Sequence, residues 1–288
     1  MKHCYLSIFL LVCVFCSCNI INPTEKIPAY ISIDTFLLNT DVGLQGSNAA
    51  KITDAWIYVN DNPIGVFELP CKVPALVEGN SKISIGPGIK SNGIAATRVI
   101  YPFYKYYYTE ADLIPEGEIK FSPVTTYLDS VNFAFKTNFD DIAGIALEAT
   151  SKSDTSLQIT SSSSEVFEGN GSLKAVLTKD TSYLEFRQLE IMQLPKQGAF
   201  VFLEMNYKCN NFLNVILYSN YLSAAPQIDN VLTLTPTDDW NKIYIDLTRY
   251  VSTQVNASSY QVYFSALKLG GKEPLVVYMD NLKIVSQK

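Results

Sequence analysis

Residues that break regular structure recur along the chain at intervals of about eight to twelve residues, a spacing typical of all-β domains. Gly, Pro, Asn and Ser separate short runs of β-branched and aromatic residues, such as Ala55–Val59, Leu213–Tyr218 and Lys242–Leu247. No long stretch carries apolar residues at helical spacing, whereas the short runs suit strands joined by tight turns. The sequence therefore predicts an all-β chain.

The chain is long enough for two hydrophobic cores. It has 288 residues, of which 48% are hydrophobic, and chains of this size commonly divide into domains. One series of predicted strands ends near Tyr127 and another begins at Phe133. We predict two β-sandwich domains, residues 28–126 and 130–288, preceded by a signal peptide at 1–17 and a polar tether at 18–27.

The first residues have the pattern of a secretory signal. Lys2 and His3 precede an apolar run, Tyr5–Cys16, that is too short to span a bilayer. The segment Phe15–Cys18, followed by polar residues, resembles the lipobox of bacterial lipoproteins. The resemblance implies cleavage before Cys18 and attachment of several acyl chains, such as palmitate, to that residue. An ordinary signal peptide that contains cysteines is the alternative.

The same resemblance implies a cellular location. Asn19 rather than Asp follows Cys18, which in Gram-negative lipoproteins implies transport to the outer membrane, with the periplasmic or surface-exposed face undetermined. Several acyl chains anchor a protein stably where one would be marginal. The net charge of −6 attracts neither nucleic acid nor anionic headgroups. The predicted partners are the membrane, through the acyl chains, and polysaccharide or envelope proteins.

Histidine chemistry is excluded from the mature chain. The one histidine, His3, lies in the predicted signal, so histidine general bases, triads and metal ligands are absent. Glu110, Asp112 and Glu116 resemble a carboxylate pattern of jelly-roll glycosidases, but the last spacing is one residue longer and Pro115 interrupts the strand. We expect a solvated strand end, no catalytic residue and no enzyme activity.

The cysteine distribution argues against a structural disulfide. Of six cysteines, only Cys71 and Cys209 lie outside the predicted export segment. They fall in different predicted domains and far apart in sequence, so we expect two buried thiols.

The first predicted domain contains a hairpin pattern. A strand at Asp54–Asn60 is followed by Ile64–Gly65, then by Pro70 and Pro74, and then by the strand Ile83–Ile85. This order resembles PEGA-like and related Ig-like or transthyretin-like modules, although the tetrapeptide that names the PEGA family is absent. The resemblance implies a β-sandwich with a structural or cell-envelope role.

Four segments of the second predicted domain, Phe133–Asp141, Val166–Lys174, Asp239–Tyr244 and Val277–Ile284, occur in a recognisable order. They look like the opening strand, the Gly-Ser loop strand, the tryptophan strand and the closing strand of carbohydrate-binding-module jelly rolls. The resemblance implies a jelly roll in which Trp240 packs in the core; a platform on which a sugar stacks is the alternative for this residue.

This resemblance also implies a structural calcium ion. Asp140, Asp141, Glu168 and Asp280 fall where the family often holds one. Calcium takes six to eight oxygens, and carboxylates with backbone carbonyls from a glycine-containing loop supply that mixture. The alternative is a set of ordinary turn carboxylates, with Asp280 bonded to the backbone. No other cofactor is expected.

Strand alternation predicts a polar face on the second domain. Opposite the apolar positions lie amide, guanidinium and phenol groups, at Arg187, Asn206, Asn214, Tyr218, Gln261 and Tyr263. Such groups bind sugars by hydrogen bonds to hydroxyls and by ring stacking, although any solvated sheet face also carries them. We predict non-catalytic glycan binding; the alternative is a structural or assembly component of an outer-membrane protein complex.

Aromatic residues are dense at Tyr101–Tyr108, where alternation turns about half of the rings outward. Such rings would form a contact surface for the assembly alternative. Trp56 lies in an apolar run, and we expect it in a core.

Overall fold

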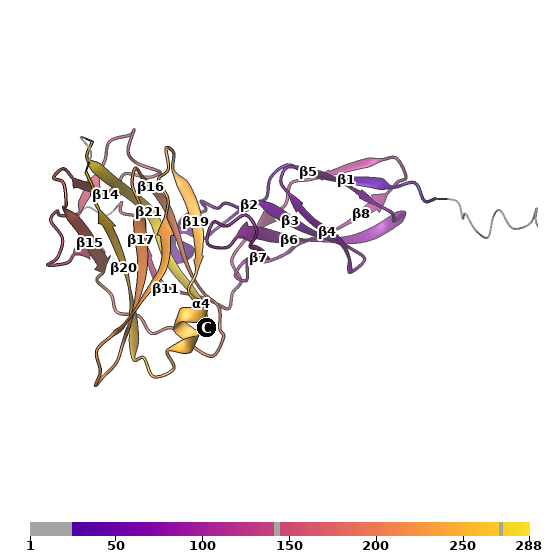
Figure 1. Ribbon diagram of the computed structural model, residues 1–288. Helices are drawn as coiled ribbons and strands as arrows, with labels where there is room; N and C mark the ends of the chain where they lie inside the picture. Colours follow the sequence, from indigo (N-terminus) through magenta and orange to yellow (C-terminus); the bar gives the residue numbers. More distant parts are fainter. Residues whose placement is uncertain (1–24, 141–144, 271–272) are drawn as a thin grey trace, which may run out of the picture.

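The computed structural model describes residues 25–140, 145–270 and 273–288. The described chain forms two bodies that lie end to end (Figure 1), and strands dominate both of them. Helix is limited, in these ranges, to the short α3 (Val42–Gln45) and α4 (Thr248–Thr253). The all-β prediction is confirmed.

The first body is a sandwich of two sheets. The first sheet has the order β5 (Cys71–Ala75), β1 (Ala29–Ile33), β9 (Glu118–Phe121), with β1 parallel to β9. The second sheet has the order β4 (Asn62–Glu68), β3 (Asp54–Val59), β6 (Gly79–Lys90), β7 (Arg98–Ile100), and β8 (Tyr107–Leu113) also pairs with β6. A parallel pair, β2 (Leu37–Leu38) and β10 (Val124–Thr125), completes this body. Ile31, Ile57 and Ile85 are fully buried between the sheets.

The turn between β3 and β4 follows from its sequence. Asn60 and Asp61 have φ values of 52° and 62°. Asn and Asp tolerate this left-handed region better than other non-glycine residues, and two such residues in succession suit a tight hairpin.

The second body is a sandwich of antiparallel sheets. One sheet has the order β13 (Gln158–Thr160), β14 (Ser172–Leu177), β21 (Leu275–Gln287), β16 (Val201–Cys209), β19 (Asn241–Asp246), and β11 (Val131–Thr137) also pairs with β21. The other sheet has the order β12 (Leu147–Ala149), β15 (Tyr183–Gln188), β20 (Ser259–Leu267), β17 (Leu213–Asn220), β18 (Gln227–Leu234). Leu203, Phe264 and Ile284 belong to the core between them.

A separate apolar cluster, here called the joint, connects the two bodies. Its buried members come from both sides of residue 130: Leu38, Ile89, Tyr101, Phe103, Tyr104, Tyr127, Val131, Phe202, Tyr244 and Val285. The ring of Tyr101 meets that of Phe202 edge-on, with centroids 5.3 Å apart. The aromatic residues of Tyr101–Tyr108 thus have different surroundings. Tyr101, Phe103 and Tyr104 lie in the joint, Tyr107 packs on the first core and Tyr108 is exposed.

A buried carboxylate lies at the centre of the joint. Glu204 of β16 accepts hydrogen bonds from the Tyr101 and Tyr127 hydroxyls at 2.7 and 2.8 Å. It also pairs with Lys242 of β19 at 3.2 Å. Burial alone would raise the pKa of Glu204, but Lys242, Lys283 and the two hydroxyls outweigh it and lower the pKa. The Glu204 carboxylate is therefore satisfied by two hydroxyls and an ion pair, whereas two lysines face this one carboxylate, and Lys242 Nζ, within the described part of the chain, makes no hydrogen bond beyond that ion pair.

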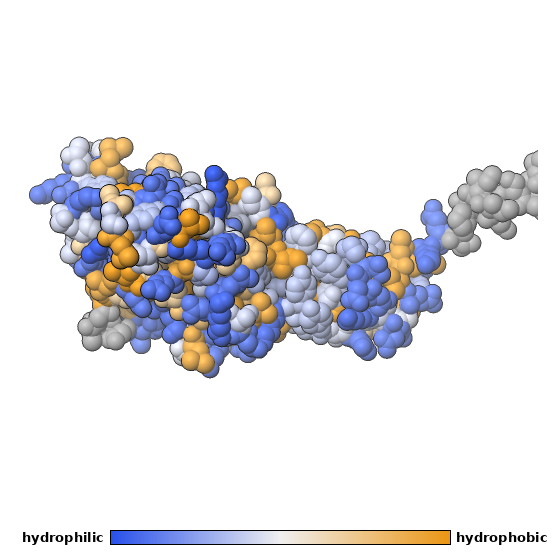
Figure 2. Space-filling model, turned by 90° about the horizontal axis from the view of Figure 1, so that it is seen from below, coloured by the Kyte–Doolittle hydropathy of each residue, from blue (hydrophilic) through white to orange (hydrophobic). Residues whose placement is uncertain are grey.

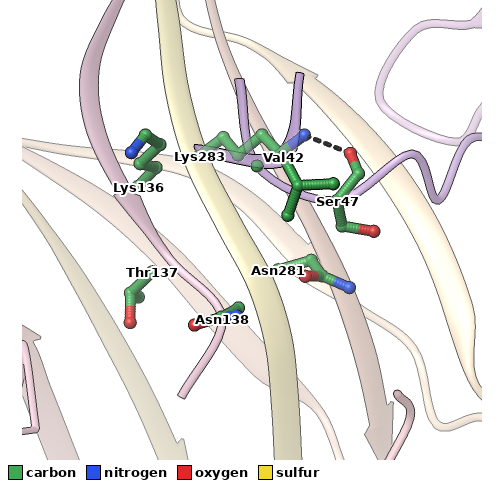
Figure 3. Close-up of a pocket in the computed structure, with 8 residues that line it drawn as sticks. Val42, Ser47, Lys136, Thr137, Asn138, Asn281 and Lys283 are labelled. Atoms are coloured by element: carbon green, nitrogen blue, oxygen red, sulfur yellow. Dashed lines mark hydrogen bonds between the residues drawn. The ribbon is translucent and has the colours of Figure 1, made fainter. Parts of the chain in front are cut away.

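A small cavity of about 120 Å³ lies beside the joint (Figure 3). Lys283 of β21 donates to the carbonyl oxygen of Ser47 at 2.6 Å, and Lys136 donates to that of Gly43 at 3.0 Å. Gly46 has a φ of 72°, and a Cβ there would come within 3.0 Å of the Lys283 Cε. The α3 loop of the first body is therefore fastened to the second body.

Candidate functional site

Five of the six predicted ligand residues lie on one face of the five-stranded sheet. Its strands β15, β20 and β17 are neighbours, and the register pairs Arg187 with Tyr263 and Tyr218 with Gln261. Asn214 lies further along β17, opposite Ser265. Alternate residues of these strands point into the core, so the five side chains share the outer face.

Two tyrosines on this face stack on each other. The ring centroids of Tyr218 and Tyr263 are 3.8 Å apart with an interplanar angle of 23°. The Arg187 guanidinium donates to the Tyr263 hydroxyl at 3.0 Å and lies 5.8 Å from its ring centroid. Tyr263 is only 7% exposed, whereas Tyr218 is partly exposed. Tyr263 therefore supports the stack, and Tyr218 offers its ring to solvent.

An open hollow of about 420 Å³ lies beside the stack. It is lined by Glu148, Ala149, Thr150, Ser151, Lys152, Glu185, Arg187, Tyr218 and Tyr263. Glu148 and Arg187 form an ion pair at 2.7 Å. Glu185, almost fully buried, accepts from Thr150 at 2.9 Å and pairs with Lys152 at 3.2 Å. The hydrogen bond to Glu185 is the main cause that raises the pKa of Lys152.

The hollow thus presents donors and acceptors already held in place around one aromatic ring, an arrangement that can recognise a polar, hydroxyl-rich ligand. Sequence reasoning missed Glu148, Lys152 and Glu185. Glu185 was within reach of the alternation argument, since it lies two residues before Arg187 on β15. Lys152 follows β12 in a turn, where no periodicity points to it.

Two of the predicted amides are engaged within the protein. Asn214 accepts from Thr233 at 2.7 Å, and Gln261 donates to the Gln188 carbonyl oxygen at 3.2 Å. Asn206 is not on this face at all. It lies on β16 in the other sheet, 2% exposed, opposite Lys242 and Asp280. Its place on the predicted ligand face is wrong, because the outer side of β16 is covered.

The predicted calcium carboxylates are occupied by N–H and O–H donors. Asp140 accepts from the Asn170 and Gly171 amides at 2.5 and 3.1 Å. Asp280 accepts from Ser172 at 2.6 Å and from its neighbour's amide at 2.7 Å. Glu168 accepts from the Asn281 amide group at 2.8 Å.

Asp141 lies outside the described residues. Among the residues that are described, no group of three His, Cys, Asp or Glu side chains is placed to hold a metal. Each of the three carboxylates therefore accepts a hydrogen bond from another segment of the second body: Asp140 from the loop before β14, Asp280 from β14 and Glu168 from β21. The calcium ion stays a prediction.

Both tryptophans lie outside the cores, contrary to expectation. Trp240 precedes β19, is partly exposed, and contacts Phe167 and Tyr278 with centroids at 5.4 and 6.2 Å. Trp56 of β3 is partly exposed on the outer side of its sheet. In each case the apolar neighbours along the strand are buried while the indole occupies the alternate, outward position.

The remaining candidates lie away from the hollow. Glu110 and Asp112 are exposed on the outer side of β8, and Glu116 has a φ of 65° in the turn that follows. Cys71 is partly exposed and Cys209 is buried, and both are free thiols. Cys18 and the rest of the predicted export segment lie outside the described residues. Across the part of the chain that is described, no helix is long and apolar enough to cross a bilayer.

Comparison with known proteins gives matches at the level of structure. No family model matches the chain, and no curated protein matches it. A solved structure from a study of promiscuous specificity in carbohydrate-binding modules of the β-sandwich superfamily is similar at a TM-score of 0.42 and 14% identity, over 80% of this chain and 84% of that one.

Two further solved structures are similar over about half of the chain. The C-terminal family 22 carbohydrate-binding module of Clostridium thermocellum Xyn10B matches at a TM-score of 0.39 and 12% identity, over 54% of this chain and 92% of that one. The enzymatically active domain of bacteriophage CBA120 tailspike protein 4 matches at 0.40 and 11%, over 51% of this chain and 20% of that one. Similarities this low do not indicate a shared function.

Proposed function

We propose that the protein is a non-catalytic, lipid-anchored cell-envelope protein that binds polysaccharide at the hollow beside Tyr218. One observation carries the proposal: Tyr218, stacked on the buried Tyr263, offers its ring next to two fixed ion pairs, Glu148 with Arg187 and Glu185 with Lys152.

The chemistry of this hollow suits a sugar better than an apolar ligand. A pyranose has C–H faces that stack on an aromatic ring and hydroxyls that both donate and accept. The carboxylates and the cationic groups supply the matching acceptors and donors without reorganising, because each is already held by a neighbour. A flexible polysaccharide loses conformational entropy when it binds, and this loss opposes binding. We therefore expect single-site dissociation constants of roughly micromolar to millimolar.

The glycan proposal is tested with a panel of polysaccharides and glycans. Tyr218→Ala should weaken binding at least tenfold without unfolding the chain, since about 1.4 kcal/mol of lost stacking corresponds to that factor. Tyr108→Ala, which removes an exposed tyrosine of the first body, is the matched control and should bind normally. Equal binding by both variants, or no binding by the wild type across the panel, would reject the proposal.

The anchor has a separate test. Cys18→Ala should move the protein from the membrane fraction to the soluble fraction and abolish labelling with a palmitate analogue. We expect the wild type to fractionate with the outer membrane. A variant that keeps both the label and the membrane fractionation would contradict acylation at Cys18.

A second function, as an assembly component of an envelope complex, is favoured by one surface of the first body. Tyr106 and Tyr108 stack at 6.0 Å, and Tyr58 lies 6.4 Å from Tyr106. These rings and Trp56 form an aromatic patch on the outer side of the sheet that contains β3 and β6. Cross-linking in cells should then yield a defined envelope protein that Tyr108→Ala loses and Tyr218→Ala keeps.

A further inference from the structure

The described chain begins at the far end of the first body, where three segments meet. Pro28 accepts a hydrogen bond from the Glu116 amide at 2.9 Å, just before β1. Ala29 of β1 pairs with Ala75 at the end of β5. The start of the described chain, the loop after β5 and the loop after β8 therefore form one tip, opposite the joint (Figure 1).

Each of these three segments exposes an aliphatic side chain. Ile27, Leu76 and Ile114 are 55%, 58% and 62% exposed, and we call them the apolar tip. Ile27 and Leu76 also line a shallow hollow with Val77 and Pro115. Figure 2 shows apolar surface at this end of the smaller body. Three aliphatic side chains from separate loops at one end are more than the scattered exposure that a soluble surface normally carries.

The predicted acylation site, Cys18, lies close to this tip along the chain. Six residues, 19–24, lie between Cys18 and Glu25, the first described residue, and the seven steps from one Cα to the next span about 25 Å at most in a fully extended chain. An acylated Cys18 would therefore hold the apolar tip within a short distance of the bilayer surface, and would give it a high effective concentration there.

We propose that the apolar tip inserts into the headgroup region of the membrane that holds the anchor, so that the first body docks on the bilayer. This inference rests on the lipid anchor of the proposed function. Three aliphatic side chains entering the interface would bind weakly by themselves, and the anchor supplies the remaining affinity.

The charges around the tip select the lipid. Lys26 is the basic residue there, against the exposed acids Glu25, Glu78 and Glu116. An anionic surface repels such a rim, with a range of about 8 Å at physiological salt. The tip therefore favours zwitterionic headgroups, and its contact should weaken as anionic lipid is added.

The test uses the full lipidated chain reconstituted into phosphatidylcholine vesicles that contain lipids brominated on their acyl chains. Leu76→Cys, in a Cys71→Ser background, carries an environment-sensitive fluorophore. Leu222→Cys, at a 94% exposed position of the second body, is the matched control. Cys209 is buried, and burial raises the pKa of its thiol to about 11, so it should not be labelled.

We expect the bromolipids to quench most of the emission at position 76 and to leave position 222 unchanged. Anionic lipid should reduce the quenching at position 76, and salt should restore it. Equal quenching at both positions, or none at position 76 on vesicles that carry the protein, overturns the docking proposal and leaves the anchor intact. Protein that does not associate with vesicles overturns the anchor and the docking together, while glycan binding is measured independently.

Discussion

The two stacked tyrosines differ in what each can do for a ligand. Both occupy outward positions by strand alternation, which is why the sequence predicts both. Tyr263 lies on β20, the central strand of its sheet, between Tyr218 and Arg187. Which ring stays accessible depends on these contacts across strands, and a single strand's pattern does not contain that information.

Ionisation of Asp280 should make the stability of the second body depend on pH. Burial raises its pKa to about 7, against the opposing hydrogen bonds from Ser172 and Asn281. Between its unfolded and folded pKa values the folded chain keeps a proton that the unfolded chain has lost. This contribution to stability is complete below about pH 4 and is lost as the pH rises through 7.

We therefore expect the melting temperature to fall by about 5 °C between pH 5 and 7.5, measured by calorimetry. Asp280→Asn should remove this dependence, whatever its absolute stability. Burial lowers the pKa of Lys283 to about 8, so its contribution changes only above this window. A wild-type profile that is flat, or that rises, between pH 5 and 7.5 would contradict the assignment.

At the scale of elements, the strands that alternate cleanly are the ones that the sequence predicts well. β17 alternates buried and partly exposed residues along its whole length, and both its apolar set and Tyr218 lie where expected. β16 is buried at eight of nine positions, because the core covers one side and the joint covers part of the other. The prediction that Asn206 lies on an open ligand face is wrong for this reason. The periodicity of one strand does not reveal which outer sheet faces are covered by another part of the molecule.

The loop Glu168–Gly171 packs against the side chain of Asp140. Gly169 has a φ of 69°, and a Cβ there would lie 2.4 Å from an Asp140 carboxylate oxygen, so the loop closes tightly over that side chain. We expect Asp140→Ala to lower the stability of the second body by about 1–3 kcal/mol, the cost of leaving amides without acceptors. Asp239→Ala, at an exposed turn, is the control.

Calcium is tested on the same loop. Because one Asp140 oxygen, Oδ1, already accepts two backbone amides, the alternative of ordinary turn carboxylates predicts that excess chelator leaves the melting temperature unchanged. A fall on chelation, together with calcium found by elemental analysis, would instead support the ion that the sequence resemblance implies.

For the whole molecule, the joint determines how the two bodies behave together. Glu204→Gln removes the buried negative charge that attracts Lys242 and Lys283. Breaking such a site typically costs about 3–5 kcal/mol, so we expect a fall in melting temperature on the order of 10 °C. Asp34→Asn, which breaks the exposed pair with Lys120, should cost less than about 1 kcal/mol. Similar losses in the two variants would show that the joint contributes little.

The central position of β1 affects how the molecule bears mechanical load. Its hydrogen bonds flank it on both sides, perpendicular to the strand in the antiparallel pair with β5 and slanted in the parallel pair with β9. The predicted tether ends at residue 27, just before β1 begins at Ala29, so tension between the proposed anchor and a bound polysaccharide would pull along β1. Bonds loaded in shear share the force, whereas bonds peeled from one end break in turn. If the proposed anchor and glycan binding hold, β1 is the first strand to bear that load, and its pairing on both sides opposes extraction.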